Sequence, residues 1–174
     1  IRSFPQMQNV EEAGRLAERP GRANRRAVRA ELGGFDREAV GAAQHRLLLE
    51  TAWEAIEDAG IVLDFERGTD IAVYVGISHN DYQVIQGTPW DSHGISAHSP
   101  TGSAHSIAAN RISYCLNLRG PSVAMDTACS SALTAVHLAC ESLHAGRCEM
   151  AMAGGVTVII TPDGFIGFSQ AGML

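Results

Sequence analysis

Hydrophobic residues recur at helical spacing over three stretches of the chain. The first stretch has an apolar stripe of four residues, Leu49, Ala52, Trp53 and Ile56. A stripe of this period predicts a helix. Asp36 suits its N-cap and Gly60 its end, so we expect this helix to run from 36 to about 59. A second helix is expected from about 102 to 116.

The third helical pattern begins near residue 130. Its stripe consists of Ala132, Val136, Ala139 and Leu143, widened by Ala135 and Cys140. Gly146 stands where a C-terminal cap belongs. The pattern therefore predicts a helix that ends next to this glycine.

Short apolar runs alternate with these helices. Residues 71–77 and about 150–160 read as strands, and 121–125 alternates and ends apolar, as a short buried strand does. Residues 79–100 are polar and read as a loop. The order helix, strand, helix, strand, helix, strand indicates an α/β layered fold with right-handed crossovers.

The first 34 residues differ from the rest. They carry the Pro20-Gly21 breaker, few large apolar residues and six arginines between Arg15 and Arg29. We expect an Arg-rich loop or arm at 1–34, followed by one partial domain at 35–174. Acidic residues are interspersed in the arm, so a solvated segment is favoured over one that contacts nucleic acid or an acidic carrier protein.

Composition narrows the class of protein. The chain has 174 residues, is 45% hydrophobic and carries a net charge of −6, which argues against a general nucleic-acid binder. All 13 basic residues are arginine, which excludes a P-loop lysine and a Schiff-base lysine. The four cysteines show no C-x-x-C pairing and read as reduced thiols. No membrane span or signal peptide is indicated, so we expect a soluble, cytoplasmic protein.

Cys129 is the candidate catalytic residue. It lies between the strand at 121–125 and the third helix, on a strand-to-helix turn with small neighbours. Free backbone N–H groups and the positive end of the helix dipole favour a thiolate there, and the same N–H groups can hold an oxyanion. The pattern predicts a nucleophile; the alternative is a buried helix-start thiol.

Residues 126–133, Asp-Thr-Ala-Cys-Ser-Ser-Ala-Leu, resemble the active-site elbow of the β-ketoacyl synthases, especially the ketosynthase domains of modular polyketide synthases. Five further stretches resemble the same family in its order: a long helix at 46–61, a strand at 73–77, a helix at 108–114, a strand at 151–156 and a loop at 167–169. The resemblance runs from roughly Arg46 to Leu174. It implies a thiolase-like fold, of which this chain supplies most of the N-terminal half.

The resemblance also implies a function. Cys129 would accept an acyl group from a carrier-protein thioester, as an acyltransferase of polyketide chain extension, and hold it for decarboxylative Claisen condensation. The family's two catalytic histidines and its Gly-rich loop have no counterpart here. We therefore expect an N-terminal portion that does not condense acyl groups alone. The alternatives are part of a fatty-acid condensing enzyme, or a non-catalytic remnant that serves in assembly or docking.

Partners follow from the same resemblance. We expect an acyl carrier protein, with substrates on its phosphopantetheine, no other cofactor, no bound metal and no nucleic acid. In the family the strand before the nucleophile lies at a dimer interface, which predicts a homodimer through Ser122 to Thr127. We also expect self-association through helix faces left exposed, including the stripe of Leu49, Trp53 and Ile56.

Three features leave questions open. Residues 42–46, Ala-Ala-Gln-His-Arg, stand where the family usually has Asp-Pro-Gln-Gln-Arg, which leaves open how the first helix packs and whether the parent domain is active. His137, Glu141 and His144 share one helical face and would suit a metal, although a solvated face is the favoured interpretation. His93, His98 and His105 would suit the lining of a substrate entrance, but surface positions are the favoured interpretation for them too.

Overall fold

The computed structural model describes residues 43–79, 81, 102 and 104–174. The Arg-rich segment 1–34, the Asp36 cap, most of the expected loop at 79–100, and both His93 and His98 lie outside the described residues.

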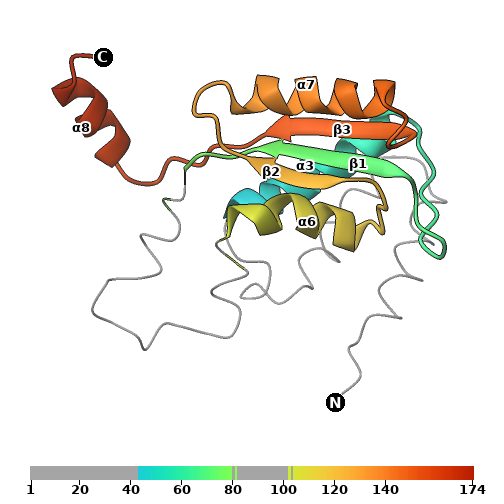
Figure 1. Ribbon diagram of the computed structural model, residues 1–174. Coiled ribbons are helices and arrows are strands. Elements are labelled where there is room, and N and C mark those ends of the chain that lie inside the picture. The colour runs from blue at the N-terminus through green and yellow to red at the C-terminus, as the bar shows by residue number, and fades with distance from the viewer. Residues whose placement is uncertain (1–42, 80, 82–101, 103) are drawn as a thin grey trace.

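Parallel strands form a sheet in the order β2-β1-β3 (Figure 1). They are β1 (Ile71–Gly76), β2 (Ser122–Met125) and β3 (Met150–Gly155). Every residue of β1 is buried, as expected for the central strand of a parallel sheet. All three predicted strands are confirmed, although β3 ends at 155 and not at 160.

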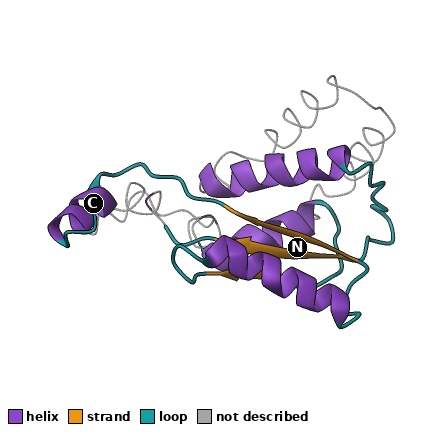
Figure 2. Ribbon diagram, turned by 90° about the horizontal axis from the view of Figure 1, so that it is seen from above, coloured by secondary structure: helices purple, strands orange, loops and turns teal. Residues whose placement is uncertain are grey.

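Helices cover both faces of this sheet (Figures 1 and 2). On one face α3 (Ala43–Asp58) and α6 (His105–Cys115) pack on a large apolar core that includes Ile71, Val73 and Val75. On the other face α7 (Ser131–His144) packs on β1 and β3 over a smaller core. Alternate residues of β1 thus belong to the two cores. The predicted α/β layered fold is confirmed.

The buried face of α7 matches the predicted stripe only in part. Ala135 and Ala139 are buried as predicted, and Ser131 and Ser142 are buried beside them. Val136 and Leu143 are instead 48% and 42% exposed, so their expected place in the stripe was wrong. Small side chains face the sheet because the helix lies close to it: a Cβ added at Gly155 would stand 3.0 Å from the Ala132 Cβ.

The apolar stripe of α3 is confirmed, but its expected exposure is wrong. Leu49, Trp53 and Ile56 are all buried, because α6 and the sheet cover them. Gln44 and His45 are also buried at the start of this helix. His45, which stands where the family's usual run has a glutamine, is therefore packed into the fold.

The described helices end in the same way. At each end a residue with positive φ follows the helix, and its N–H and that of the next residue return to helix carbonyls in the Schellman pattern. The left-handed residues are Gly60 after α3, Asn117 after α6, Gly146 after α7 and Gly172 after the last helix. The ends predicted at Gly60 and Gly146 are confirmed.

The last helix, α8 (Asp163–Gln170), was expected to be a loop around residues 167–169. None of its residues is buried, and it extends away from the layered body (Figure 1). Phe165, Ile166 and Phe168 are exposed on it. Its eight residues include two glycines, Gly164 and Gly167, which have a low helix propensity and made the sequence pattern a poor indicator of a helix.

Candidate active site

The β2–α7 turn, residues 126–130, joins the edge strand to the helix on the opposite side of the sheet from α3 and α6. Cys129 is exposed in this turn, two residues before α7 begins. The alternative of a buried thiol is therefore wrong. The cysteine lies at the carboxyl end of the parallel strands, where ligand sites of open α/β sheets usually form.

Side-chain oxygens hold the backbone of the turn. Asp126 accepts a hydrogen bond from the Ala128 N–H at 2.9 Å. The Ser130 hydroxyl lies 2.7 Å from the Thr127 carbonyl oxygen and 2.9 Å from the Thr127 Oγ1. These local bonds fix a turn that has no regular secondary structure of its own.

Ala128 has a φ of +56°, which is uncommon for a residue with a Cβ. Its carbonyl accepts the Ser131 N–H at 3.1 Å and the Ser131 hydroxyl at 2.6 Å. The Cys129 N–H, in contrast, donates to no acceptor among the described residues. It is thus available to a ligand, as the predicted oxyanion donor has to be.

Gly76 at the end of β1 lets the start of α7 approach the sheet. A Cβ at this position would stand 2.6 Å from the Ser131 carbonyl carbon and 2.7 Å from the Ala132 nitrogen. Such distances exclude any side chain here without a backbone shift. The start of α7, which directly follows the turn with Cys129, therefore lies on the end of the central strand.

The other three cysteines differ in environment. Burial raises the pKa of the Cys115 thiol to about 11, and nearby Arg111 only partly opposes this. Cys148 is buried, whereas Cys115 is half-buried. Cys140, in contrast, is exposed on α7.

A second polar group lies beyond the end of β1, and sequence reasoning missed it. Gln44 donates from Nε2 to the His79 carbonyl at 2.6 Å, which joins α3 to this segment. Asp81 Oδ2 accepts the N–H groups of Ile160 at 3.0 Å and Thr161 at 3.1 Å. The three residues 44, 79 and 81 are distant in sequence from 160–161, so no local pattern signalled the contact.

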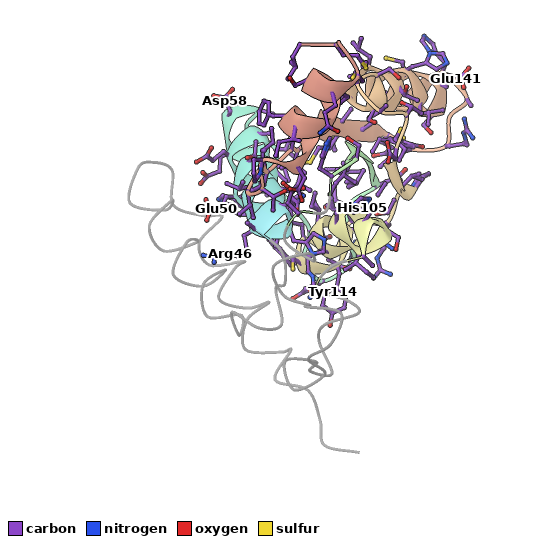
Figure 3. All side chains as sticks on the ribbon, turned by 90° about the vertical axis from the view of Figure 1, so that its left-hand side faces the viewer. Arg46, Glu50, Asp58, His105, Tyr114 and Glu141 are labelled. Carbon is purple, nitrogen blue, oxygen red and sulfur yellow. The ribbon has the colours of Figure 1, made fainter. Side chains whose placement is uncertain are left out.

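The remaining sequence candidates do not form a metal site. His137 and Glu141 pair at 3.8 Å on an exposed face of α7, and His144 is also exposed there. Glu141 lies on the outer side of α7, away from α6, which carries His105 (Figure 3). In the described part of the chain, no three His, Cys, Asp or Glu side chains are grouped to hold a metal. His105 is half-buried, not a surface residue as expected.

No helix among the described residues is both long and apolar enough to cross a bilayer.

Comparison with known proteins points to one class of enzyme. The family model of the β-ketoacyl synthase N-terminal domain matches residues 6–174. A phenolphthiocerol/phthiocerol polyketide synthase of Mycobacterium tuberculosis is 47% identical over 154 residues, which are 83% of this chain and 10% of that protein. The non-reducing polyketide synthase olcA of Penicillium canescens is 49% identical over 131 residues, 75% of this chain and 5% of that protein.

Solved structures agree with these matches. A ketosynthase from module 6 of the bacillaene synthase of Bacillus subtilis has a TM-score of 0.64 and 36% identity, over 78% of this chain and 22% of that one. An oxazolomycin ketosynthase domain from Streptomyces albus has a TM-score of 0.65 and 37% identity, over 77% and 23%. The chain thus spans a tenth or less of the curated relatives named and about a quarter of these ketosynthase structures.

Proposed function

Because this chain belongs to the β-ketoacyl synthase family, we propose that it forms the cysteine-bearing part of a polyketide synthase ketosynthase domain. Cys129 is the acyl-accepting nucleophile in this proposal. The observation that carries it is the exposed thiol on a turn fixed by hydrogen bonds, at the start of a helix and at the carboxyl ends of parallel strands.

The first half-reaction follows from this geometry. The Cys129 sulfur attacks the carbonyl carbon of an acyl thioester on a carrier protein's phosphopantetheine, and a C–S bond forms. The carbonyl electron pair moves to oxygen and is held there by the Cys129 N–H, which no described residue occupies. When the pair returns, the pantetheine thiolate leaves and takes up a proton, and the acyl group stays on Cys129.

The second half-reaction regenerates the cysteine. A malonyl-type thioester loses CO₂, and the resulting carbanion attacks the acyl carbonyl. A carbon–carbon bond forms, and the Cys129 thiolate leaves. In this proposal groups beyond the turn assist the decarboxylation, since the turn itself offers one thiol and one free N–H.

Polyketide extension is favoured over fatty-acid synthesis as the context. The curated relatives named above are polyketide synthases, and the solved neighbours are ketosynthase domains of bacillaene and oxazolomycin synthesis. The ordered turn around Cys129 favours a catalytic domain over a remnant that serves only in docking.

The proposal includes two partners. An acyl carrier protein delivers the thioester. A second copy pairs along β2, which is an edge strand and has a 40% exposed Val123. An unpaired strand edge with an exposed apolar side chain favours such association.

An activated thioester tests the nucleophile. The chain is incubated with S-phenyl thioacetate, and the acetylated cysteine is located by peptide mapping. We expect acetylation of Cys129 well above that of Cys140, which is exposed on α7. Cys129→Ala should abolish the acetylation and Cys140→Ala should leave it unchanged. Equal acetylation of the two thiols would contradict the proposal.

A further inference from the structure

Ser131 is a buried hydroxyl in direct contact with the turn that carries Cys129. Its side chain is 5% exposed. The oxygen accepts the Thr127 N–H at 2.9 Å and lies 2.6 Å from the Ala128 carbonyl oxygen, to which it donates. One side-chain atom therefore fixes two peptide groups of the turn.

The Ala128 carbonyl and the Cys129 N–H belong to one peptide unit. This unit is planar and trans, so its C=O and N–H point in opposite directions. Ser131 holds the C=O toward the start of α7 through both its N–H and its hydroxyl. The N–H of Cys129 must then point away from the helix, and it meets no acceptor among the described residues.

We propose that Ser131 is a positioning residue that aims the Cys129 N–H at the acyl oxygen. The inference rests on the proposed function and adds to it a group that does not touch the substrate. Ser130 differs, because its hydroxyl reaches only the Thr127 carbonyl and Oγ1 and lies on the exposed side of the turn.

Two observations support this role: the backbone conformation of Ala128 is unfavourable, and the backbone of Ser131 is closely packed. Ala128 has a φ of +56°, a conformation that is unfavourable for a residue with a Cβ, so this peptide would relax if its carbonyl were released. Gly76 fixes the backbone of Ser131 itself, since a Cβ there would stand 2.8 Å from the Ser131 Cβ. The backbone that carries the Ser131 hydroxyl is therefore restricted in position.

Two reactions of the same sulfur separate aiming from folding. Acylation by S-phenyl thioacetate passes through an oxyanion, whereas alkylation by iodoacetamide does not place charge on a carbonyl oxygen. Ser131→Ala should therefore slow acylation of Cys129 by on the order of ten-fold, less than complete loss of an oxyanion donor causes. The rate at which iodoacetamide alkylates Cys129 in this variant should change by less than about three-fold. A purely structural role would lower both rates together.

Ser142→Ala is the matched control, since Ser142 is a buried serine on the same helix whose hydroxyl bonds Tyr74 and not the turn. It should leave the ratio of the two rates unchanged. Ser131→Thr, which keeps the hydroxyl, should keep the ratio within about three-fold of the unaltered chain.

The outcomes are distinct. An unaltered chain that fails to acylate at Cys129 contradicts the proposed function. Normal acylation in the unaltered chain with an unchanged ratio in Ser131→Ala overturns only the role of Ser131, as does an equal drop in Ser142→Ala. Alkylation of the buried Cys148 would show that Ser131→Ala has unfolded. In that case Ser131→Thr is the deciding variant. If it is folded and its ratio of acylation rate to alkylation rate at Cys129 is on the order of ten-fold lower than in the unaltered chain, the inference is overturned.

Discussion

The Tyr74 hydroxyl and the Ser142 hydroxyl lie 2.5 Å apart and are both buried, which links the central strand to the last turn of α7. Ser142→Ala leaves the tyrosine hydroxyl without this partner. We expect a loss of about 1–3 kcal/mol in the free energy of unfolding, because a buried hydroxyl without a partner keeps its desolvation cost. Urea denaturation followed by circular dichroism measures the loss. In the double variant with Tyr74→Phe the loss should be smaller than the sum of the two single losses; additive losses would show that the two hydroxyls do not interact.

Gly76→Ala should destabilise the chain by about 2 kcal/mol or more, because its Cβ would overlap backbone atoms that cannot move independently. Gly154→Ala is the control, since a Cβ there has no neighbour within 4 Å. We expect it to change the stability by less than about 0.5 kcal/mol. Thermal melts of the two variants give the comparison, and equal melting temperatures would contradict the close approach of α7 to β1.

The four cysteines should alkylate in two groups. Cys129 and Cys140 are exposed and should react with iodoacetamide within minutes at neutral pH, whereas Cys148 is buried and should be protected. Cys115 should be protected too, because burial raises the pKa of its thiol to about 11 and leaves almost no thiolate. Peptide mapping after brief labelling tests this order. Rapid labelling of Cys115 in a chain that protects Cys148 would be the contrary result.

The contact of Asp81 with residues 160–161 should depend on pH. The N–H groups of Ile160 and then Thr161 lower the pKa of the Asp81 carboxyl from its usual value of 3.8. Because the folded pKa lies below the unfolded one, the contact stabilises the fold above about pH 4 and is lost as the pH falls through the folded pKa. NMR of the Thr161 amide between pH 6 and 2 follows this loss.

Asp81→Asn should remove that pH dependence. Asp70→Asn provides the control, because Asp70 accepts the Glu149 N–H and does not contact residues 160–161. A Thr161 amide that titrates unchanged in Asp81→Asn would show that another group is responsible.

Self-association should occur at micromolar concentration and involve β2. Val123→Glu places a charge on the exposed edge strand and should lower the average mass in light scattering. Val136→Glu places the same charge on the exposed face of α7. Comparing the two variants shows which of the two surfaces takes part in the association. A monomer in the unaltered chain would contradict the expectation, and a mass reduced only by Val136→Glu would move the contact from β2 to α7.

Periodicity predicted the central parts of this fold well. The apolar run at 71–77 became a fully buried strand, and the stripe of Leu49, Trp53 and Ile56 became the buried face of α3. In each case one local pattern is enough, because burial of apolar residues sets both where an element lies and how it faces. The glycines at 60 and 146 marked helix ends for a similarly local reason, since both adopt positive φ.

The same reasoning failed where contact with a distant segment decides the outcome. Gly76 and Gly155 bring α7 so close to the sheet that only small residues fit beneath it, so Ala135 and Ser142 are buried and Val136 is not. No window of the α7 sequence contains that information. The strand-to-helix turn that carries Cys129 was predicted because its pattern is local, but the hydrogen bonds of Ser131 to residues 127 and 128 are known only from the folded turn.

The pairing of the sheet has a consequence for the chain while it is being synthesised. Val73 in the central strand pairs with Ser122, and Gly76 pairs with Gly155, so both partners of β1 come from much later in the sequence. At about 5–20 residues per second, the most apolar strand of the fold is without either neighbour for several seconds after it leaves the ribosome. In that interval α3, which precedes β1, is the one described helix that can cover it. Substitutions on the sheet-facing side of α3 should therefore reduce the yield of soluble protein in cells more than they reduce the stability of the finished fold.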